Sequence, residues 1–156
     1  MKENKFIFLL CGLNFIFCLA GIFFFSNPIF VPGHEYTDIA RNIAAGRGYV
    51  GSGFFHLKYA PSAFLTPVYS YFLATLIRIF DLPNAFLIAR IFNALLNALI
   101  LILIYVLARE VFDKETANIA SIIFAFYFPF VGWTVEIWDT LLFVLCLLFL
   151  VLLLIK

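Results

Sequence analysis

The chain alternates between long apolar runs and short polar links, and the runs have the length of membrane spans. A helix needs about 20 predominantly apolar residues to cross a bilayer. Four runs approach that length, at about 6–25, 85–108, 116–131 and 139–155. The pattern therefore predicts an all-α membrane protein with about four transmembrane helices in a single transmembrane domain, residues 1–156.

The first run has the flanks of a signal peptide but the length of an anchor. Lys2 and Lys5 precede it, as in the basic n-region of a signal peptide. Its apolar stretch exceeds the ~7–15 residues of a signal h-region, and no A-x-A cleavage site follows. We therefore predict that this run is a retained signal anchor.

Basic residues at the ends of the runs predict an orientation in the membrane. Cytoplasmic ends of spans carry an excess of Lys and Arg. With Lys2 and Lys5 in the cytoplasm, the link 109–115 is cytoplasmic too, and residues 26–84 and 132–139 lie outside. The chain is thus expected in the plasma or inner membrane with its N-terminus in the cytoplasm.

The first outer loop, residues 26–84, differs in composition from the rest of the chain. It holds five of the seven Tyr and both His, so it is too aromatic for disorder, and a loop this long is usually functional. Apolar positions repeat at helical spacing from about residue 33 to a stop at Gly46. A second helix is predicted at 67–80, with Pro67 in its first turn. We predict that both are amphipathic helices lying on the outer membrane face; alternatively 67–80 spans, and everything after it is inverted.

Composition supports the membrane class and excludes others. The chain is 65% apolar and 12% charged, whereas soluble domains are about 45–50% apolar with about 25% charged residues. A net charge of +1 gives no reason to expect a nucleic-acid partner. Three cysteines, Cys11, Cys18 and Cys146, lie in apolar runs without metal-ligand spacing, so we interpret them as small apolar filler.

Glu35 and its neighbour His34 are the first candidates for chemistry, because they lie just beyond the first span. A carboxylate there can act as a general base toward an acceptor hydroxyl, or bind a divalent metal ion that holds a phosphate. His34 can be a metal ligand or a proton carrier. The alternative is that the charge of Glu35 only suits the N-terminus of a helix.

A second pair of carboxylates, Glu136 and Asp139, lies in the other outer link. Ionisable groups at membrane depth are costly and tend to be functional. The alternative is that both are solvated at headgroup level. Because apolar residues 140–143 follow at once, the sequence predicts that Asp139 is drawn into the helical bundle.

Five cationic or amide positions complete the candidates. Arg90 lies near the outer end of the second run and can meet a phosphate there, or it snorkels. Asn93 and Asn97 share its helical face, and we interpret them as interhelical polar packing. Arg47 and Lys58 can hold an anionic lipid headgroup, or they are solvated loop charges.

An ordered set of short motifs resembles one known family. Residues 33–49, GHEYTDIARNIAAGRGY, resemble the first outer loop of membrane-embedded GT-C glycosyltransferases. The resemblance is closest to the bacterial group related to protein mannosyltransferases and lipid A aminoarabinose transferases. Further matches follow in the same order at 60–61, 66–69, 89–99, 107–112 and 139–143. Family members are much longer, so the resemblance implies the N-terminal part of such an enzyme.

The resemblance implies an inverting transferase with a polyprenyl-phosphate sugar as donor. The acceptor would be a lipid, a glycan or a protein. Glu35 matches the family's loop acid, the proposed base or acceptor binder, and His34 stands where an Asp often appears. Asp139 would help to shape the site. Substrate contacts are expected from Arg47, Lys58, Arg90 and Glu136, and no cofactor is implied beyond a divalent metal ion as an option.

Two rival functions belong to other classes. One is a small four-span flippase for a lipid-linked sugar, and the other is a non-catalytic membrane scaffold. Transporters place ionisable groups within their spans at mid-depth. The middles of the first, third and fourth runs are uncharged, which favours the transferase.

Overall fold

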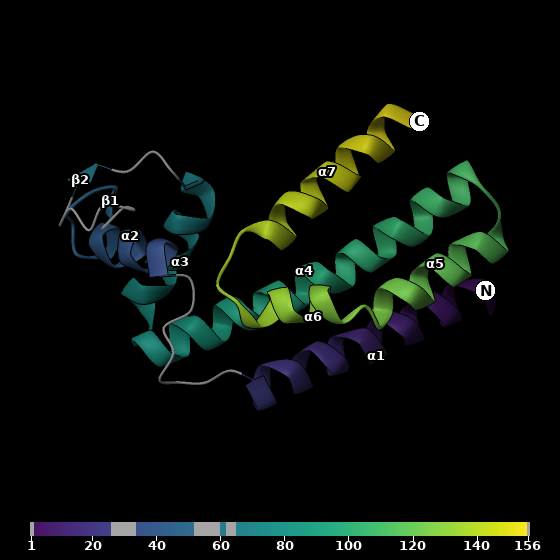
Figure 1. Ribbon diagram of the computed structural model, residues 1–156, viewed down its shortest axis with the longest axis horizontal. Coiled ribbons are helices and arrows are strands. Elements are labelled where there is room, and N and C mark those ends of the chain that lie inside the picture. The colour runs from purple at the N-terminus through teal and green to yellow at the C-terminus, as the bar shows by residue number, and fades with distance from the viewer. Residues whose placement is uncertain (1, 26–33, 52–59, 62–64, 156) are drawn as a thin grey trace. The chain divides into compact units, whose positions relative to one another are not determined.

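The computed structural model describes residues 2–25, 34–51, 60–61 and 65–155, and for residues 2–4, 34 and 60 the backbone alone. Along these residues the chain is helical apart from one pair of very short strands (Figure 1). The elements are α1 Lys2–Phe25, α2 His34–Ala44, β1 Val50–Gly51, β2 Ala60–Pro61, α3 Pro67–Ile79, α4 Leu82–Val111, α5 Lys114–Ala125, α6 Phe128–Val135 and α7 Thr140–Ile155.

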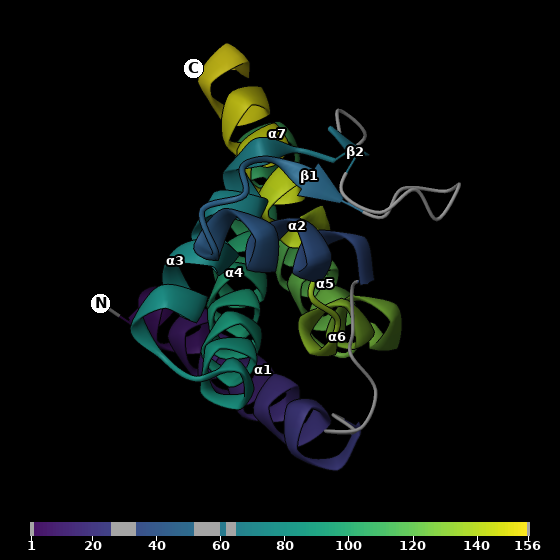
Figure 2. The ribbon, with the colours of Figure 1, turned by 90° about the vertical axis from the view of Figure 1, so that its left-hand side faces the viewer.

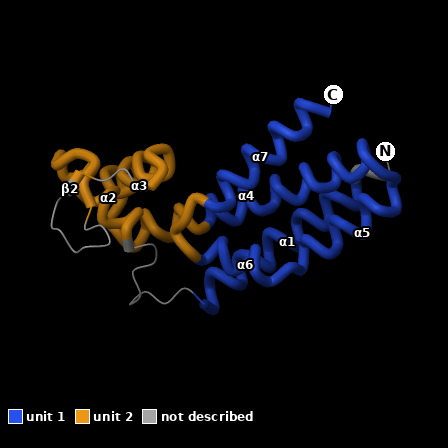
Figure 3. Tube along the Cα trace, turned by 45° about the horizontal axis from the view of Figure 1, so that its top comes forward, with its two compact units in different colours: residues 1–26, 91–135, 140–156 blue, residues 27–90, 136–139 orange. Residues whose placement is uncertain are grey.

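The chain divides into two compact units, coloured in Figure 3. The bundle unit comprises Met1–Ser26, Ile91–Val135 and Thr140–Lys156. The loop unit comprises Asn27–Arg90 and Glu136–Asp139. Their boundary falls inside α4, after Arg90.

Helix lengths in the described chain confirm an all-α membrane protein. Lys5–Phe25 of α1 and the whole of α4 are long and apolar enough to cross a membrane. The pair α5 and α6 passes the same test together, although it is bent by 48°. Helix α7 is apolar but has only 16 residues. The number of crossings and the sidedness of the chain therefore stay predictions.

The bundle unit buries one side of each helix and leaves large apolar side chains on the other. Figure 1 shows α1, α4 and α5 running side by side. The core of the bundle unit contains Ile7, Leu10, Leu96, Ile100, Leu101, Tyr105, Ala117, Phe124, Ala125 and Leu141. On the outside Phe8, Phe23 and Phe24 are 65%, 82% and 76% exposed. Exposure of this kind suits contact with lipid.

The third apolar run is not one continuous helix, and whether its residues 116–131 span the membrane stays a prediction. Helix α5 ends at Ala125 and α6 begins at Phe128. Pro129 explains the break, because proline has no N–H to donate and its ring clashes with the carbonyl four residues earlier, here that of Ala125. The Asn14 side chain on α1 donates to that carbonyl instead, over 2.8 Å.

Asn14 also belongs to a wider set of buried side chains inside the bundle unit. Asn97 on α4 donates to Asn14 Oδ1 at 3.2 Å and to Cys18 Sγ at 3.3 Å. All three side chains are fully buried. The interpretation of Asn97 as interhelical packing is confirmed, and Cys18 is buried as predicted. Cys146 is exposed, so it is not buried filler.

The loop unit is built on the packing of α2 against α3 (Figure 2). Both helices were predicted by the sequence, and α2 buries the expected stripe of Tyr36, Ile39, Ala40 and Ile43. Gly46 and Gly48, at φ 75° and 84°, turn the chain after α2, in a conformation that favours glycine. Strand β1 then pairs antiparallel with β2, Val50 opposite Pro61. That α2 and α3 lie on a membrane face remains a prediction.

Candidate functional site

Aromatic side chains from three segments of the loop unit meet around Tyr36. The Tyr36 ring lies edge-to-face with Tyr69 of α3, with ring centroids 5.3 Å apart. It contacts Trp138 in the same manner at 5.5 Å. Tyr36 is 1% exposed and Tyr69 is fully buried. The link 136–139 is thereby joined to α2 and α3 within one unit.

A hydroxyl–carboxylate chain, formed by Tyr36, Thr66 and Asp139, runs beside these rings. Thr66 Oγ1 donates to Asp139 Oδ2 at 2.6 Å. The Tyr36 hydroxyl lies 3.0 Å from Thr66 Oγ1, and the Asp139 carboxylate is near enough to raise its pKa. The sequence predicts that Asp139 is drawn into the bundle, whereas in the structure its carboxylate is bonded within the loop unit.

Burial keeps the phenol of Tyr36 protonated. It raises the pKa of Tyr36 to about 12, as desolvation, the largest cause, disfavours the phenolate. The bond with Thr66 opposes this shift, and the bond and negative charge of Asp139 add to it. Tyr36 is therefore a neutral hydrogen-bond donor at physiological pH.

Glu35 precedes Tyr36 in the first turn of α2. Its side chain is half-buried, and its Oε1 is buried with no hydrogen-bond partner in the described part of the chain. The position fits the alternative that a negative charge suits a helix N-terminus. An unpaired carboxylate oxygen, however, is costly to bury and is also free to accept a proton. His34 begins α2, and its side chain lies outside the described residues.

Arg90 is the buried cation of the loop unit, at 8% exposure. Glu136 and Tyr69 are its electrostatic neighbours. Glu136 itself is exposed, as the solvated alternative predicts, but its charge acts on Arg90. Because Arg90 is buried, it does not snorkel to solvent.

The structure describes one of the two remaining predicted cations, Arg47. Arg47 is exposed, and its Nε donates to Asn42 Oδ1 at 2.8 Å in the turn after α2. Lys58 lies outside the described residues. Within the described part of the chain, no three His, Cys, Asp or Glu side chains form a group that could hold a metal ion.

Three partners in this site were not predicted from the sequence: Thr66, Tyr69 and Trp138 had no assigned role in it. Thr66 carries a local signal, because a Thr before Pro67 is typical of a helix N-cap. Its bond to Asp139 spans 73 residues, and no spacing rule reports a contact of that range.

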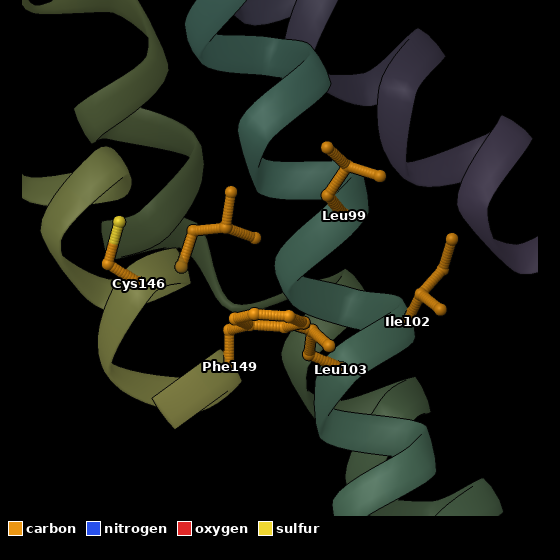
Figure 4. A pocket seen from close by; sticks show the side chains of 6 residues that line it. Leu99, Ile102, Leu103, Cys146 and Phe149 are labelled. Carbon is orange, nitrogen blue, oxygen red and sulfur yellow. The ribbon is translucent and has the colours of Figure 1, made fainter. Parts of the chain in front are cut away.

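A separate apolar cavity lies in the bundle unit, between α4 and α7 (Figure 4). Its volume is about 300 Å³. Its lining is Leu99, Ile102, Leu103, Leu145, Cys146 and Phe149. With almost no polar surface, the cavity suits a hydrocarbon chain.

Comparison with known proteins identifies the family. No curated protein and no solved structure matches the chain. A family model described as dolichyl-phosphate-mannose-protein mannosyltransferase matches residues 64–156, more than half of the 156 residues. The match includes Thr66, Arg90, Glu136 and Asp139, and it begins after Glu35 and Tyr36. The chain therefore belongs to the dolichyl-phosphate-mannose-protein mannosyltransferase family of GT-C glycosyltransferases, as the sequence motifs indicated.

Proposed function

We propose that the protein transfers a sugar from a polyprenyl-phosphate carrier to a hydroxyl acceptor on the outer face of the membrane. The family supports a glycosyltransferase with a lipid-linked donor. The observation that carries the proposal within this chain is the buried Oε1 of Glu35, which has no hydrogen-bond partner among the described residues. A general base needs an uncommitted lone pair aimed at the proton that it takes.

The proposed reaction needs a base, Glu35, and a leaving group, the polyprenyl phosphate. The Glu35 carboxylate takes the proton of the acceptor hydroxyl, and the hydroxyl oxygen attacks the anomeric carbon of the donor sugar. The bond between that carbon and the phosphate oxygen breaks, and its electron pair leaves with the polyprenyl phosphate. Attack from the side opposite the phosphate inverts the anomeric centre.

Arg90 is the cation proposed to meet the phosphate. A guanidinium can bind two phosphate oxygens at once, and such charge-assisted bonds are strong. In the free protein the Glu136 carboxylate attracts the Arg90 guanidinium. A bound phosphate would replace that attraction with its own. Arg47 and Lys58 are proposed only as outer contacts for the same anion.

The hydrocarbon part of the donor needs an apolar environment. The cavity between α4 and α7 has an apolar lining, and in a membrane span it is filled by hydrocarbon. Either an ordinary lipid acyl chain or a polyprenyl tail satisfies it.

Replacement of Glu35 by Gln tests the proposed base. The full chain is reconstituted in liposomes with dolichyl-phosphate mannose, and release of dolichyl phosphate is measured together with transfer of mannose. Because Gln cannot take a proton at neutral pH, we expect Glu35→Gln to lower turnover by about 10²–10⁴-fold, with the amount of folded protein unchanged.

The matched control is Glu115→Gln, which changes another first-turn glutamate, on α5, and should leave turnover unchanged. Full turnover of Glu35→Gln would remove Glu35 from the role of base. Movement of the donor across the bilayer without sugar transfer would favour the flippase instead.

A further inference from the structure

Thr66 is placed to cap a helix but does not do so. It is the N-cap residue of α3, with extended backbone at φ −68° and ψ 132°, and Pro67 follows it. A threonine at this position usually accepts a hydrogen bond from an N–H of the first turn and stabilises the helix. Here no side-chain cap bond forms, and the hydroxyl instead donates to Asp139 Oδ2 at 2.6 Å. A local preference is overridden by a contact 73 residues away.

Tyr36, the other hydroxyl in this set, is the neighbour in sequence of Glu35, the proposed base. Tyr36 bonds Thr66 through its hydroxyl, and its ring is held between Tyr69 and Trp138. Its side chain is 1% exposed, so it has little freedom to move. Glu35 is the preceding residue in the same helical turn, and its backbone moves only if that of Tyr36 does.

We infer that Tyr36, Thr66 and Asp139 are positioning residues, which fix the first turn of α2 and thereby the carboxylate of Glu35. The inference rests on the proposed role of Glu35. It gives Asp139 a role other than that of a second base, namely to accept the hydrogen bond of Thr66 at its Oδ2.

Packing alone does not explain the choice of these residues. A phenylalanine at Tyr36 and a valine at Thr66 would keep nearly all of the apolar contacts. A half-buried carboxylate is unfavourable unless hydrogen bonds compensate for its lost hydration. The Thr66 hydroxyl donates such a bond to Asp139, and the Tyr36 hydroxyl in turn bonds Thr66.

The first experiment separates positioning from general stability by kinetics. Tyr36→Phe and Thr66→Val each remove one hydroxyl, and Thr66→Ser retains it. In the liposome assay with dolichyl-phosphate mannose, we expect the first two to lower kcat by up to about 10²-fold, since a small misplacement of a catalytic group has effects of that size. The KM for the donor should stay unchanged, and Thr66→Ser should restore kcat.

A second background makes this test specific to Glu35. A residue that acts only through another has no further effect once that other is removed. In the Glu35→Gln background, Tyr36→Phe and Thr66→Val should therefore cause no additional loss. Losses that multiply in the double variants would overturn the inference.

Amide hydrogen exchange of the full-length chain in lipid nanodiscs reports on positioning without any turnover. Exchange across residues 35–38 should rise in Tyr36→Phe and in Thr66→Val, and stay low in Thr66→Ser. The matched control is Thr75→Val, which removes an exposed hydroxyl bonded to Tyr71 O on the same helix α3. If exchange stays low in Thr66→Val while Glu35→Gln is inactive, the positioning inference is wrong but the proposed base stands. If exchange rises in Thr66→Val but Glu35→Gln is fully active, Glu35 is not the base, and the inference that these residues position a base is wrong as well.

Discussion

A set of polar side chains joins distant parts of the sequence in each of the two units, and these two sets differ in chemistry. In the bundle unit the amide of Asn14 bonds the Ala125 carbonyl, 111 residues away, and accepts from Asn97. In the loop unit Thr66 donates to Asp139 across 73 residues. The first set is neutral and fully buried, whereas the second ends on a half-buried carboxylate.

The difference shows how the surroundings select the polar group. Where lipid surrounds a helix, a backbone carbonyl freed by proline must find a donor within the protein. An amide provides that donor without bringing a charge into the bundle. In the loop unit a charge is retained although a neutral side chain would be cheaper to bury. The bundle set therefore should govern stability, and the loop set should govern turnover.

The largest effect on stability is expected from Asn14→Leu. This change leaves the Ala125 carbonyl without its donor and takes the acceptor from Asn97. A buried polar group without a partner costs about 1–3 kcal/mol, so the free energy of unfolding should fall by about that amount. Denaturant unfolding in detergent micelles measures it, with Asn118→Leu, which removes another amide of the bundle unit, as the control. If Asn14→Leu left stability intact but lowered turnover, the division of roles between the units would be wrong.

A smaller and more diagnostic effect is expected from Pro129→Ala. Alanine restores an N–H four residues after Ala125, so the carbonyl can regain a helical bond. Asn14→Leu should then destabilise the Pro129→Ala protein by about 1 kcal/mol less than it destabilises the natural chain, in a double-mutant cycle. Equal costs in both backgrounds would mean that Asn14 stabilises the bundle by some means other than the proline-freed carbonyl.

The sequence predicted the parts of this molecule that follow from periodicity. The apolar runs gave the membrane class, and the stripe of Tyr36, Ile39 and Ile43 gave the buried face of α2. The break at Pro129 could have been predicted, since proline disfavours a continuous helix. The prediction instead relied on the length of the apolar run. The partner of Asn14 was not readable, because it depends on which helix lies beside the break.

In the candidate site, too, local patterns were predicted from the sequence and tertiary contacts were not. Glu35 and Asp139 were found as carboxylates next to apolar runs, and their family motifs set the order along the chain. The pairing of Asp139 with Thr66 could not be found, because it is a tertiary contact that no local pattern encodes. Arg47 was proposed for an anion because of its charge, and this stays a prediction; in the structure its Nε donates to Asn42 of α2.

The smallest effect is expected from a second aspartate, Asp113, which can be compared directly with Asp139. Asp113 and Asp139 each directly precede a helix, α5 and α7. Asp113 behaves as its local sequence predicts and accepts from the Thr116 N–H at 2.7 Å. This hydrogen bond is the main cause that lowers the pKa of Asp113 below its usual value.

A lowered pKa in the folded state means that the cap stabilises the protein above the unfolded-state pKa of about 3.9, and that this contribution disappears as the pH falls through the folded value. Asp113→Asn retains a capping side chain that does not titrate. Thermal unfolding of both proteins between pH 7 and pH 2.5 should therefore show the natural chain losing stability relative to Asp113→Asn only at the acidic end. A stability difference that is constant across this range would mean that the Asp113 carboxylate has the same pKa folded and unfolded. The local hydrogen bond would then account for neither the pKa shift nor the contrast with Asp139.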